Sequence, residues 1–348
     1  MSARRAETAE TAAPPHPRTT HTLIGHAAAE HALLAAYRSG RMPHAWLVTG
    51  PAGIGKATLA YRVARFVLAN PDPAAPQVQR APSLAVEPAH PVARRIAAQA
   101  QGDLLVLERR INEKTGKLFQ DIPVDDVRRT VSFFGATAGE GGWRVAIVDS
   151  VDELNAAGAN ALLKVVEEPP QRSLLLLIAH SAARVLPTVR SRCRVAALRP
   201  LDLPDLVQAA GAALERDPAD PVLAEAAAAA DGSVARAIAL CGGPLLAVRE
   251  RVNELLGRVP AVDPRALHAL ADVLDRADRD AVDTFVEAVR TWLSSELRRP
   301  PQTPARLAPL AEAWSQIDRA AREVETFNLD RRPLVFAVFR CLAEAVPG

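Results

Sequence analysis

The sequence predicts an α/β fold in which a parallel sheet is followed by helices alone. Short apolar segments alternate with helical patterns as far as Pro200, and this alternation is typical of parallel sheets. One apolar segment, Ala45–Thr49, leads directly into a glycine-rich loop and then a helix. After Pro200 no further strand pattern is convincing, so the rest of the chain is expected to be helical.

Hydrophobic spacing, turn residues and prolines define the expected elements. In the helix over 56–68 the apolar residues recur every three or four positions, as on one face of a helix. The turn residues over 112–117 predict a hairpin. In chain order we expect helix 27–37, strand 45–49, helix 56–68, strand 104–107, a helix from Val124, strand 144–149, helix 156–166, strand 174–178, and helices over 203–214, 222–230, 233–240, 245–256, 264–275, 280–297, 307–327 and 332–345.

These patterns divide the chain into four segments. Residues 1–20 are rich in Ala, Pro, Thr and Arg and are expected to be a disordered tail. A nucleotide-binding domain is expected over 21–200, with a Pro- and Ala-rich surface insertion over 70–100. A small helical lid over 201–245 and a helical C-terminal domain over 246–348 should follow.

The composition excludes several classes of protein. A chain of 348 residues with 49% hydrophobic and 24% charged residues is ordinary for a globular protein of more than one domain. A net charge of +2 is far from that of a dedicated nucleic-acid binder, so Arg94, Arg95, Arg109 and Arg110 are interpreted as solvated charges. No apolar run approaches the ~18 residues that span a bilayer, and no membrane contact is expected. The N-terminus lacks the apolar stretch of a secretory signal, which predicts a cytoplasmic protein.

The three cysteines, Cys193, Cys241 and Cys341, are far apart in the sequence. None belongs to a CxxC pair, so neither a zinc site nor a disulfide framework is expected, and no metal ligand is assigned.

The loop from Gly50 to Thr58 has the pattern of a phosphate-binding loop with one hydroxyl missing. Gly50, Gly53, Gly55 and Lys56 fit G-x-x-x-x-G-K, in which backbone N–H groups and the lysine hold phosphates. Ala57 stands where the pattern needs a Ser or Thr to bind Mg²⁺. Thr58 lies one residue on, which turns it by ~100° around the helix; we keep it as a nucleotide-binding candidate, not as a metal ligand.

The strand over 144–149 ends in Asp149-Ser150, where ATPases of this type carry Asp-Glu. Asp149 can face a metal, but Ser150 cannot act as the general base, and Asp152 leaves the strand in another direction. Two parts of the hydrolytic machinery are therefore absent. We expect nucleotide binding to survive and efficient hydrolysis to be lost.

Three further motifs carry a resemblance to a known family. They are Pro43-His44-Ala45-Trp46-Leu47, then Asn160-Ala161-Leu162-Leu163-Lys164 with Glu167-Glu168-Pro169-Pro170, and Ser191-Arg192-Cys193. In this order and spacing they resemble the AAA+ subunits of the bacterial DNA polymerase III clamp loader. The resemblance covers about residues 20–245 and implies a RecA-like AAA+ P-loop domain, a helical lid, and a helical C-terminal domain that joins an oligomeric collar.

The resemblance also implies roles for single residues. Arg192 would be an arginine finger that acts in trans on ATP bound by the adjacent subunit, with Ser191 and Cys193 shaping its turn. Arg236 would touch phosphate as the second sensor; the alternative is an ordinary helix start capped by Ser233. Either His180 or Ser181 would be the first sensor.

Two kinds of subunit share these motifs, and Ala57 and Ser150 match the kind whose ATP site is degraded. Such a subunit would contact the motor and delta subunits through its AAA+ and C-terminal helical domains, and the sliding clamp and primed DNA through the complex. It would be a component of the DNA polymerase III holoenzyme and would take part in DNA synthesis through that assembly. ATP and Mg²⁺ are its candidate cofactors, and zinc is not expected. The alternatives are an active gamma/tau-like motor ATPase and a scaffold with a relic loop. A P-loop kinase fits poorly, since no acceptor pocket is indicated.

Overall fold

The computed structural model describes residues 15–109, 122–135, 142–241, 243–277, 279–327 and 329–346. These residues form two compact units, one that ends at Ile238 and one that starts at Ala239. The hairpin predicted over 112–117 lies outside the described residues.

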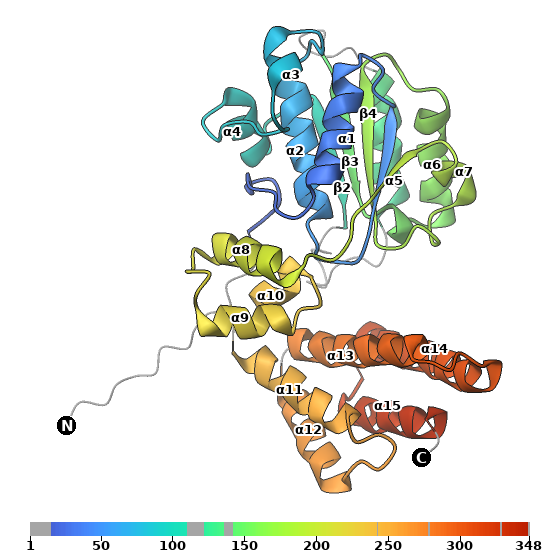
Figure 1. The fold of residues 1–348 in the computed structure, drawn as a ribbon. Coiled ribbons are helices and arrows are strands. Elements are labelled where there is room, and N and C mark those ends of the chain that lie inside the picture. Colours follow the sequence, from blue (N-terminus) through green and yellow to red (C-terminus); the bar gives the residue numbers. More distant parts are fainter. Residues whose placement is uncertain are drawn as a thin grey trace. The chain divides into compact units, whose positions relative to one another are not determined.

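A parallel five-stranded sheet in the order β2-β3-β4-β1-β5 forms the centre of the first unit (Figure 1). The predicted α/β class is confirmed. The strands are β1 (Ala45–Thr49), β2 (Leu104–Glu108), β3 (Arg144–Asp149), β4 (Ser173–Ala179) and β5 (Arg194–Ala197). β1 and β4 are buried at every position, which explains their continuous apolar sequence.

Strand β5 was not predicted. It lies at the edge of the sheet beside β1, and of its four residues only Ala196 is buried. A short strand with three exposed residues has no apolar run or alternation strong enough to be recognised in the sequence.

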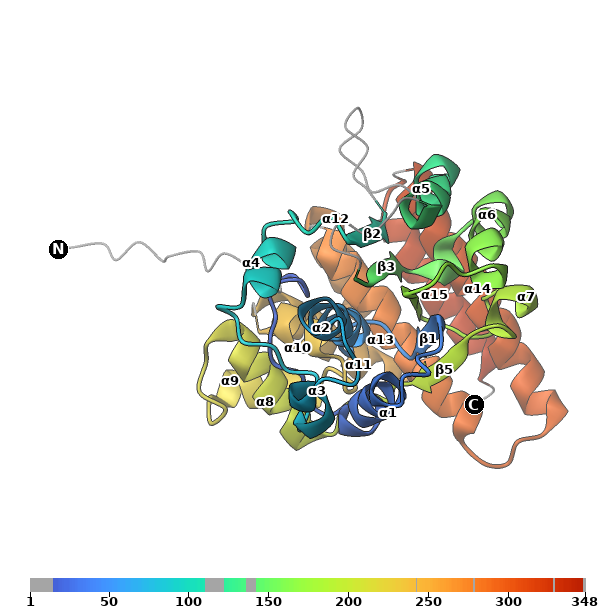
Figure 2. The same cartoon turned by 90° about the horizontal axis from the view of Figure 1, so that it is seen from above.

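Helices cover both faces of the sheet, as Figure 2 shows from above. α1 and α2 lie on one face and α5, α6 and α7 on the other, so that residues on the two sets of helices are separated by the sheet. The helices of this part are α1 (Ala27–Arg38), α2 (Lys56–Ala69), α3 (Pro76–Arg80), α4 (Pro91–Ala97), α5 (Val124–Gly135), α6 (Ala156–Glu167) and α7 (Pro187–Arg190), with a short 3₁₀ turn at Val151–Glu153.

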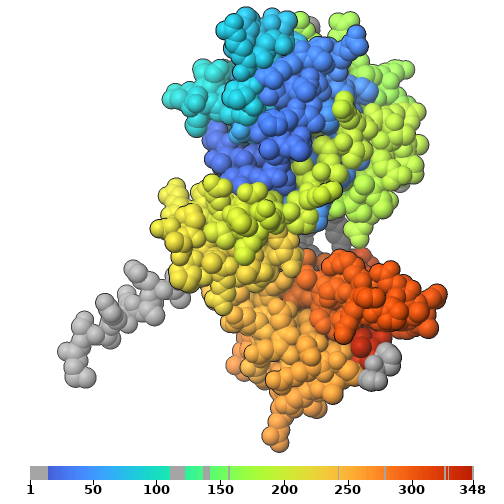
Figure 3. Space-filling view, in the orientation of Figure 1, coloured from blue at the N-terminus to red at the C-terminus, as the bar shows by residue number. Residues whose placement is uncertain are grey.

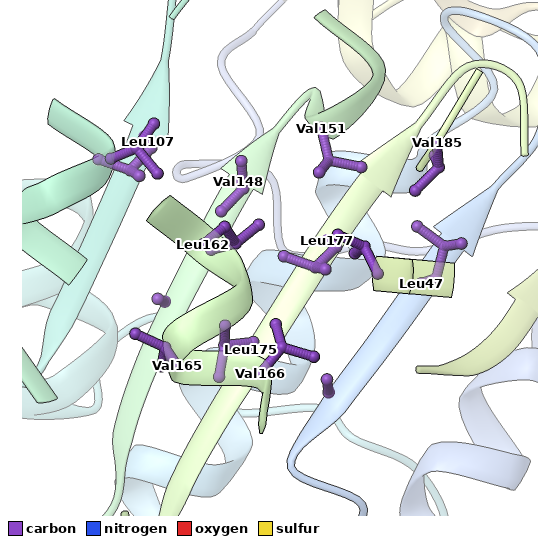
Figure 4. Close-up of a cluster of buried hydrophobic side chains, with 14 of the residues drawn as sticks. Leu47, Leu107, Val148, Val151, Leu162, Val165, Val166, Leu175, Leu177 and Val185 are labelled. Atoms are coloured by element: carbon purple, nitrogen blue, oxygen red, sulfur yellow. The ribbon is translucent and has the colours of Figure 1, made fainter. Parts of the chain in front are cut away.

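One hydrophobic core fills the space between the sheet and the helices α5 and α6. Leu162 and Val165 of α6 pack with Val148 of β3 and with Leu175 and Leu177 of β4 (Figure 4). All are at most 4% exposed. Burial of this apolar face is the main contribution to holding α6 on the sheet.

The N-terminal segment and the Pro-rich segment are more ordered than the sequence indicated. A disordered tail was expected over 1–20, but residues 15–20 are described, and Arg65, 2% exposed, donates to the carbonyls of Pro17 and Arg18. The expected surface insertion over 70–100 contains α3 and α4. Its Leu84 is 1% exposed and donates its amide to Glu30. A few buried side chains without helical or strand periodicity leave no signal in the sequence.

The lid consists of α8 (Leu203–Leu214), α9 (Pro221–Ala228) and α10 (Val234–Leu240). In the space-filling view its yellow-green surface adjoins the blue N-terminal part of the unit (Figure 3). The turn before α10 packs tightly, since a Cβ on Gly232 would lie 2.5 Å from Cβ of Pro200, and φ there is +78°. Only glycine fits this turn.

The second unit is helical. It contains α11 (Pro244–Leu256), α12 (Pro264–Arg276), α13 (Arg279–Arg298), α14 (Pro304–Phe327) and α15 (Arg332–Ala345). α11 packs on α13, and α15 packs on both α12 and α14. Within the described residues, no helix combines the length and apolar character that crossing a membrane requires.

We predict that Leu177→Ala lowers the free energy of unfolding by about 2–5 kcal/mol, because it leaves a cavity between β4 and α6. Urea denaturation followed by circular dichroism measures this. Leu203→Ala is the matched control; Leu203 is 49% exposed, and its loss is expected to cost under about 0.5 kcal/mol. Equal midpoints for the two variants would contradict the core described here.

Candidate functional site

A pocket of about 620 Å³ lies at the glycine loop. Five of the predicted nucleotide-binding residues line it, namely Gly53, Gly55, Lys56, Thr58 and Asp149. Gly50 and Arg236 are not in its wall. The remaining wall comes from Ile54 and Ala57 of the loop, from residues 15–17 and 19–24, from Ile178 in β4 and His180 just after it, and from the lid, with Ala209, Ala212, Ala213, Glu215, Val234, Ala235 and Ile238.

The backbone of the loop is fixed by its carbonyl groups, each of which accepts a hydrogen bond from within the protein. Lys56 Nζ donates to Gly50 (2.7 Å) and Pro51 (2.5 Å), Ser233 Oγ to Ala52 (3.1 Å), the amide of Ala235 to Gly53 (3.1 Å) and His26 Nε2 to Ile54 (2.6 Å). Because a carbonyl oxygen only accepts, Nε2 of His26 carries the proton. With the carbonyls engaged in the protein, the amides of the loop and of the first turn of α2 are the groups left for an anion.

Two loop glycines are required by close contacts as well as by their backbone angles. Gly53 has φ +74°, and a Cβ there would lie 2.3 Å from Ser233 Oγ and 2.9 Å from Cβ of Ala235. Gly50 has φ +145°, and its Cβ would lie 2.6 Å from the carbonyl oxygen of Leu198. The loop is therefore in direct contact with the lid at Gly53 and with the chain after β5 at Gly50.

Lys56 and Asp149 are both largely buried, and their charges influence each other. Lys56 is 4% exposed, and this burial lowers its pKa to about 8, although the nearby Asp149 and Asp152 oppose the shift. Burial raises the pKa of Asp149, against the influence of His180 and Lys56. In both cases burial has the larger effect and favours the neutral form.

Asp152 stabilises the end of β4 and is not in the wall of the pocket. Its carboxylate accepts the amides of His180 (3.1 Å to each oxygen) and Ser181 (3.0 Å). Burial by itself raises the pKa of Asp152, but hydrogen bonds from the His180 side chain and from the amides of His180 and Ser181 outweigh it and lower the pKa to about 2. Of the two first-sensor candidates, His180 lines the pocket.

The residues at the loop do not fit a Mg²⁺ site of the usual kind. The hydroxyl position is Ala57, and the position after Asp149 is Ser150, which is 1% exposed and does not line the pocket. Within the described part of the chain, no group of three or more His, Cys, Asp or Glu residues could hold a metal ion. The loop therefore lacks the usual protein ligands of a Mg²⁺ ion.

Arg236 lies at the start of α10, but its side chain is engaged elsewhere. Nη1 donates to Asp231 at 2.7 Å. Ser233 accepts the amide of Arg236 (3.4 Å) and donates to the loop carbonyl of Ala52. The structure thus brings Ser233 and Ala235 to the loop, and not the arginine that the sequence pointed to.

Arg192 does not line this pocket. It contacts Glu167 of α6 and Thr188 of α7, and both helices lie on the opposite face of the sheet from α2 (Figure 2). The turn that carries it is closed by hydrogen bonds from the amide of Ser191 to Pro187 (2.9 Å) and from the amide of Arg192 to Val189 (3.1 Å). Ser191 Oγ donates to Thr188, and Cys193 Sγ to Val189. Burial raises the pKa of the Cys193 thiol to about 11, so that it stays protonated.

Several parts of the pocket and of the loop support were not predicted from the sequence: His26, Ser233, Ala235, and residues 15–17 and 19–24. The loop motif gives the positions that hold phosphate, but the donors for its carbonyls come from distant segments. A single buried His or Ser carries no periodic signal, so only the folded chain reveals these partners.

Comparisons with known proteins agree with the motifs. A sequence family described as DNA polymerase III, delta subunit, matches residues 25–202. The DNA polymerase III subunit delta' of Pseudomonas aeruginosa is 39% identical over 150 residues, 43% of this chain and 41% of that protein. The delta' subunit of Escherichia coli is 29% identical over 262 residues, 70% of this chain and 72% of that protein. The gamma/tau subunit of Mycobacterium tuberculosis is 33% identical over 162 residues, 46% of this chain and 25% of that protein. The match thus spans less than half of the P. aeruginosa and M. tuberculosis proteins.

We predict that Gly53→Ala separates the lid from the loop, since the new methyl group collides with Ser233 and Ala235. Hydrogen exchange at the amide of Ala235, measured by mass spectrometry, should become about tenfold faster. Gly40→Ala is the control, because Gly40 also has positive φ (+68°) but has nothing within 4 Å of an added Cβ. Unchanged exchange in Gly53→Ala would show that the lid is not held there.

Proposed function

The chain belongs to the family described as DNA polymerase III, delta subunit. Its relatives include delta' and gamma/tau subunits, and from this we propose that it helps a clamp loader place the sliding clamp on primed DNA. This membership confirms the resemblance seen in the sequence motifs. In the proposed complex the chain contacts motor and delta subunits, and it reaches the clamp and the DNA as part of the assembly.

The observation that carries the proposal is the position of Arg192. Its side chain is 41% exposed, on a turn closed by hydrogen bonds, and does not line the pocket of its own chain. It contacts α6 and α7, which lie across the sheet from α2. A guanidinium so placed is available to a nucleoside triphosphate held by a neighbouring subunit. Arginine supplied in trans stabilises the charge on a transferring phosphoryl group.

The chain's own pocket is proposed to bind nucleotide with little or no hydrolysis. The loop amides and Lys56 supply what phosphate binding needs, while Ala57 and Ser150 replace the two residues that hydrolysis needs. The same replacements argue against the active motor ATPase as the alternative function. The retained glycines and Lys56, in turn, argue against a scaffold with a relic loop.

We predict that Arg192→Ala in the reconstituted clamp loader lowers ATP turnover at the adjacent site by about 10³-fold or more, because a positioned charge on the transition state is lost. Clamp- and DNA-stimulated phosphate release measures this. Arg190→Ala is the matched control; Arg190 is exposed on the same turn and donates to Ala182. Normal turnover with Arg192→Ala in a fully assembled complex would exclude the finger.

We predict that Lys56→Ala weakens ATP binding to this chain about 10- to 100-fold, because one charged hydrogen-bond donor to phosphate is lost. Isothermal titration calorimetry on the chain alone measures the affinity. Because burial lowers the pKa of Lys56 to about 8, the charged form is complete well below pH 8. The affinity of the unsubstituted chain for ATP should therefore fall as the pH rises through about 8, and Lys56→Ala should remove this fall.

Two further titrations complete this test. Lys164→Ala, at an exposed lysine of α6, should leave the affinity unchanged. Replacing Mg²⁺ by EDTA should alter the affinity by less than about threefold, since neither Ala57 nor Ser150 can help to hold the metal. No binding at millimolar ATP would instead favour the scaffold.

A further inference from the structure

Three sequence motifs that lie far apart in the chain meet at the C-terminal end of α6. His44 belongs to the first motif, Glu167 to the second and Arg192 to the third. Nε2 of His44 donates to the carbonyl of Val166 at 2.9 Å, and Glu167 Oε1 lies 3.0 Å from Arg192 Nη2. The end of α6 thus joins the sheet to the Arg192 turn.

Contacts that do not involve Arg192 fix the end of α6 in place. The helix ends at Glu167, and Pro169 and Pro170 prevent its continuation. His44 satisfies one of the last helix carbonyls, and its own carbonyl accepts the amide of Leu175 in β4 at 2.7 Å. Glu167 is therefore presented from a helix that is anchored to the central strands.

The guanidinium of Arg192 is held from two elements. Nη2 pairs with Glu167 of α6, while Nη1 donates to the carbonyl of Thr188 in α7 at 3.0 Å and lies 3.5 Å from Ser191 Oγ. A guanidinium has five N–H groups in a fixed plane. The contacts to Glu167 and Thr188 fix that plane and leave further N–H groups free for a phosphate.

The Glu167–Arg192 pair contributes little to stability, because both side chains are exposed, 46% and 41%. Its physical effect is on orientation. An unrestrained arginine has many rotamers and must order its side chain to bind a phosphate, and small displacements of a catalytic group lower the rate strongly. A carboxylate that holds the guanidinium in advance reduces that ordering.

We propose that Glu167 is a positioning residue for Arg192, which holds the guanidinium ready for a nucleoside triphosphate bound by the adjacent subunit. This inference rests on the proposed function of Arg192. It gives the Glu167-Glu168-Pro169-Pro170 motif a role in the neighbour's reaction: the prolines end α6, and the first glutamate orients the arginine.

The test is ATP turnover by the reconstituted clamp loader with variants of this subunit. Glu167→Ala should lower kcat about tenfold with little change in the KM for ATP. Glu167→Gln keeps an acceptor for Arg192 Nη2 and should restore most of the rate. The matched control is Glu168→Ala, at the neighbouring exposed glutamate of the same charge, which should retain full turnover. Complex assembly is checked by size-exclusion chromatography for each variant.

The double variant Glu167→Ala/Arg192→Ala separates positioning from a general structural effect. It should be no slower than Arg192→Ala alone, since Glu167 acts through Arg192. Full activity of Glu167→Ala beside an inactive Arg192→Ala overturns this inference and leaves the proposed function standing. Full activity of Arg192→Ala overturns both. Faster turnover by both Glu167 variants would show that the carboxylate restrains the arginine from acting, which also contradicts positioning.

Discussion

The pocket at the glycine loop depends on one constraint: each carbonyl of the loop needs a hydrogen-bond donor from within the protein. A loop that turns its amides toward a ligand must direct its carbonyls into the protein, where each needs a donor. His26 from the start of α1, Lys56 from α2, and Ser233 and Ala235 from the lid supply those donors. The loop therefore links the first helix and the lid, and its conformation is tied to theirs.

This constraint also explains the chemistry of Lys56. In the structure its ammonium group is occupied by two loop carbonyls, and burial has lowered its pKa. A bound phosphate must compete with those carbonyls, but it also restores the charge that burial disfavours. The pocket thus offers loop amides and Lys56 to an anion, whereas Ala57 and Ser150 stand where hydrolytic loops of this type carry a hydroxyl and a glutamate.

The sheet separates the two functional regions of the unit. The loop and its pocket lie with α2. Arg192 contacts Glu167 of α6 and Thr188 of α7, and these helices lie on the opposite face of the sheet (Figure 2). The proposed role in a shared active site requires such a separation between the pocket and the arginine. His44, Val166 and Glu167 connect the central strands to the second region.

The sequence by itself determined the strands β1 to β4, the long helices, the loop and the Ser191-Arg192-Cys193 turn, because each has a strong local signal: a continuous apolar run, a helical period, or a motif of fixed spacing. It gave no sign of the edge strand β5, of the packed segment over 15–20, or of the donors to the loop. It also pointed to Arg236 at the phosphates, where the structure brings Ser233 and Ala235 to the loop and pairs Arg236 with Asp231. The contact between Glu167 and Arg192 was not predicted from the sequence either. Only the tertiary structure decided these partners, because a hydrogen bond between distant segments depends on where the fold brings single side chains, and one residue leaves no pattern in the sequence.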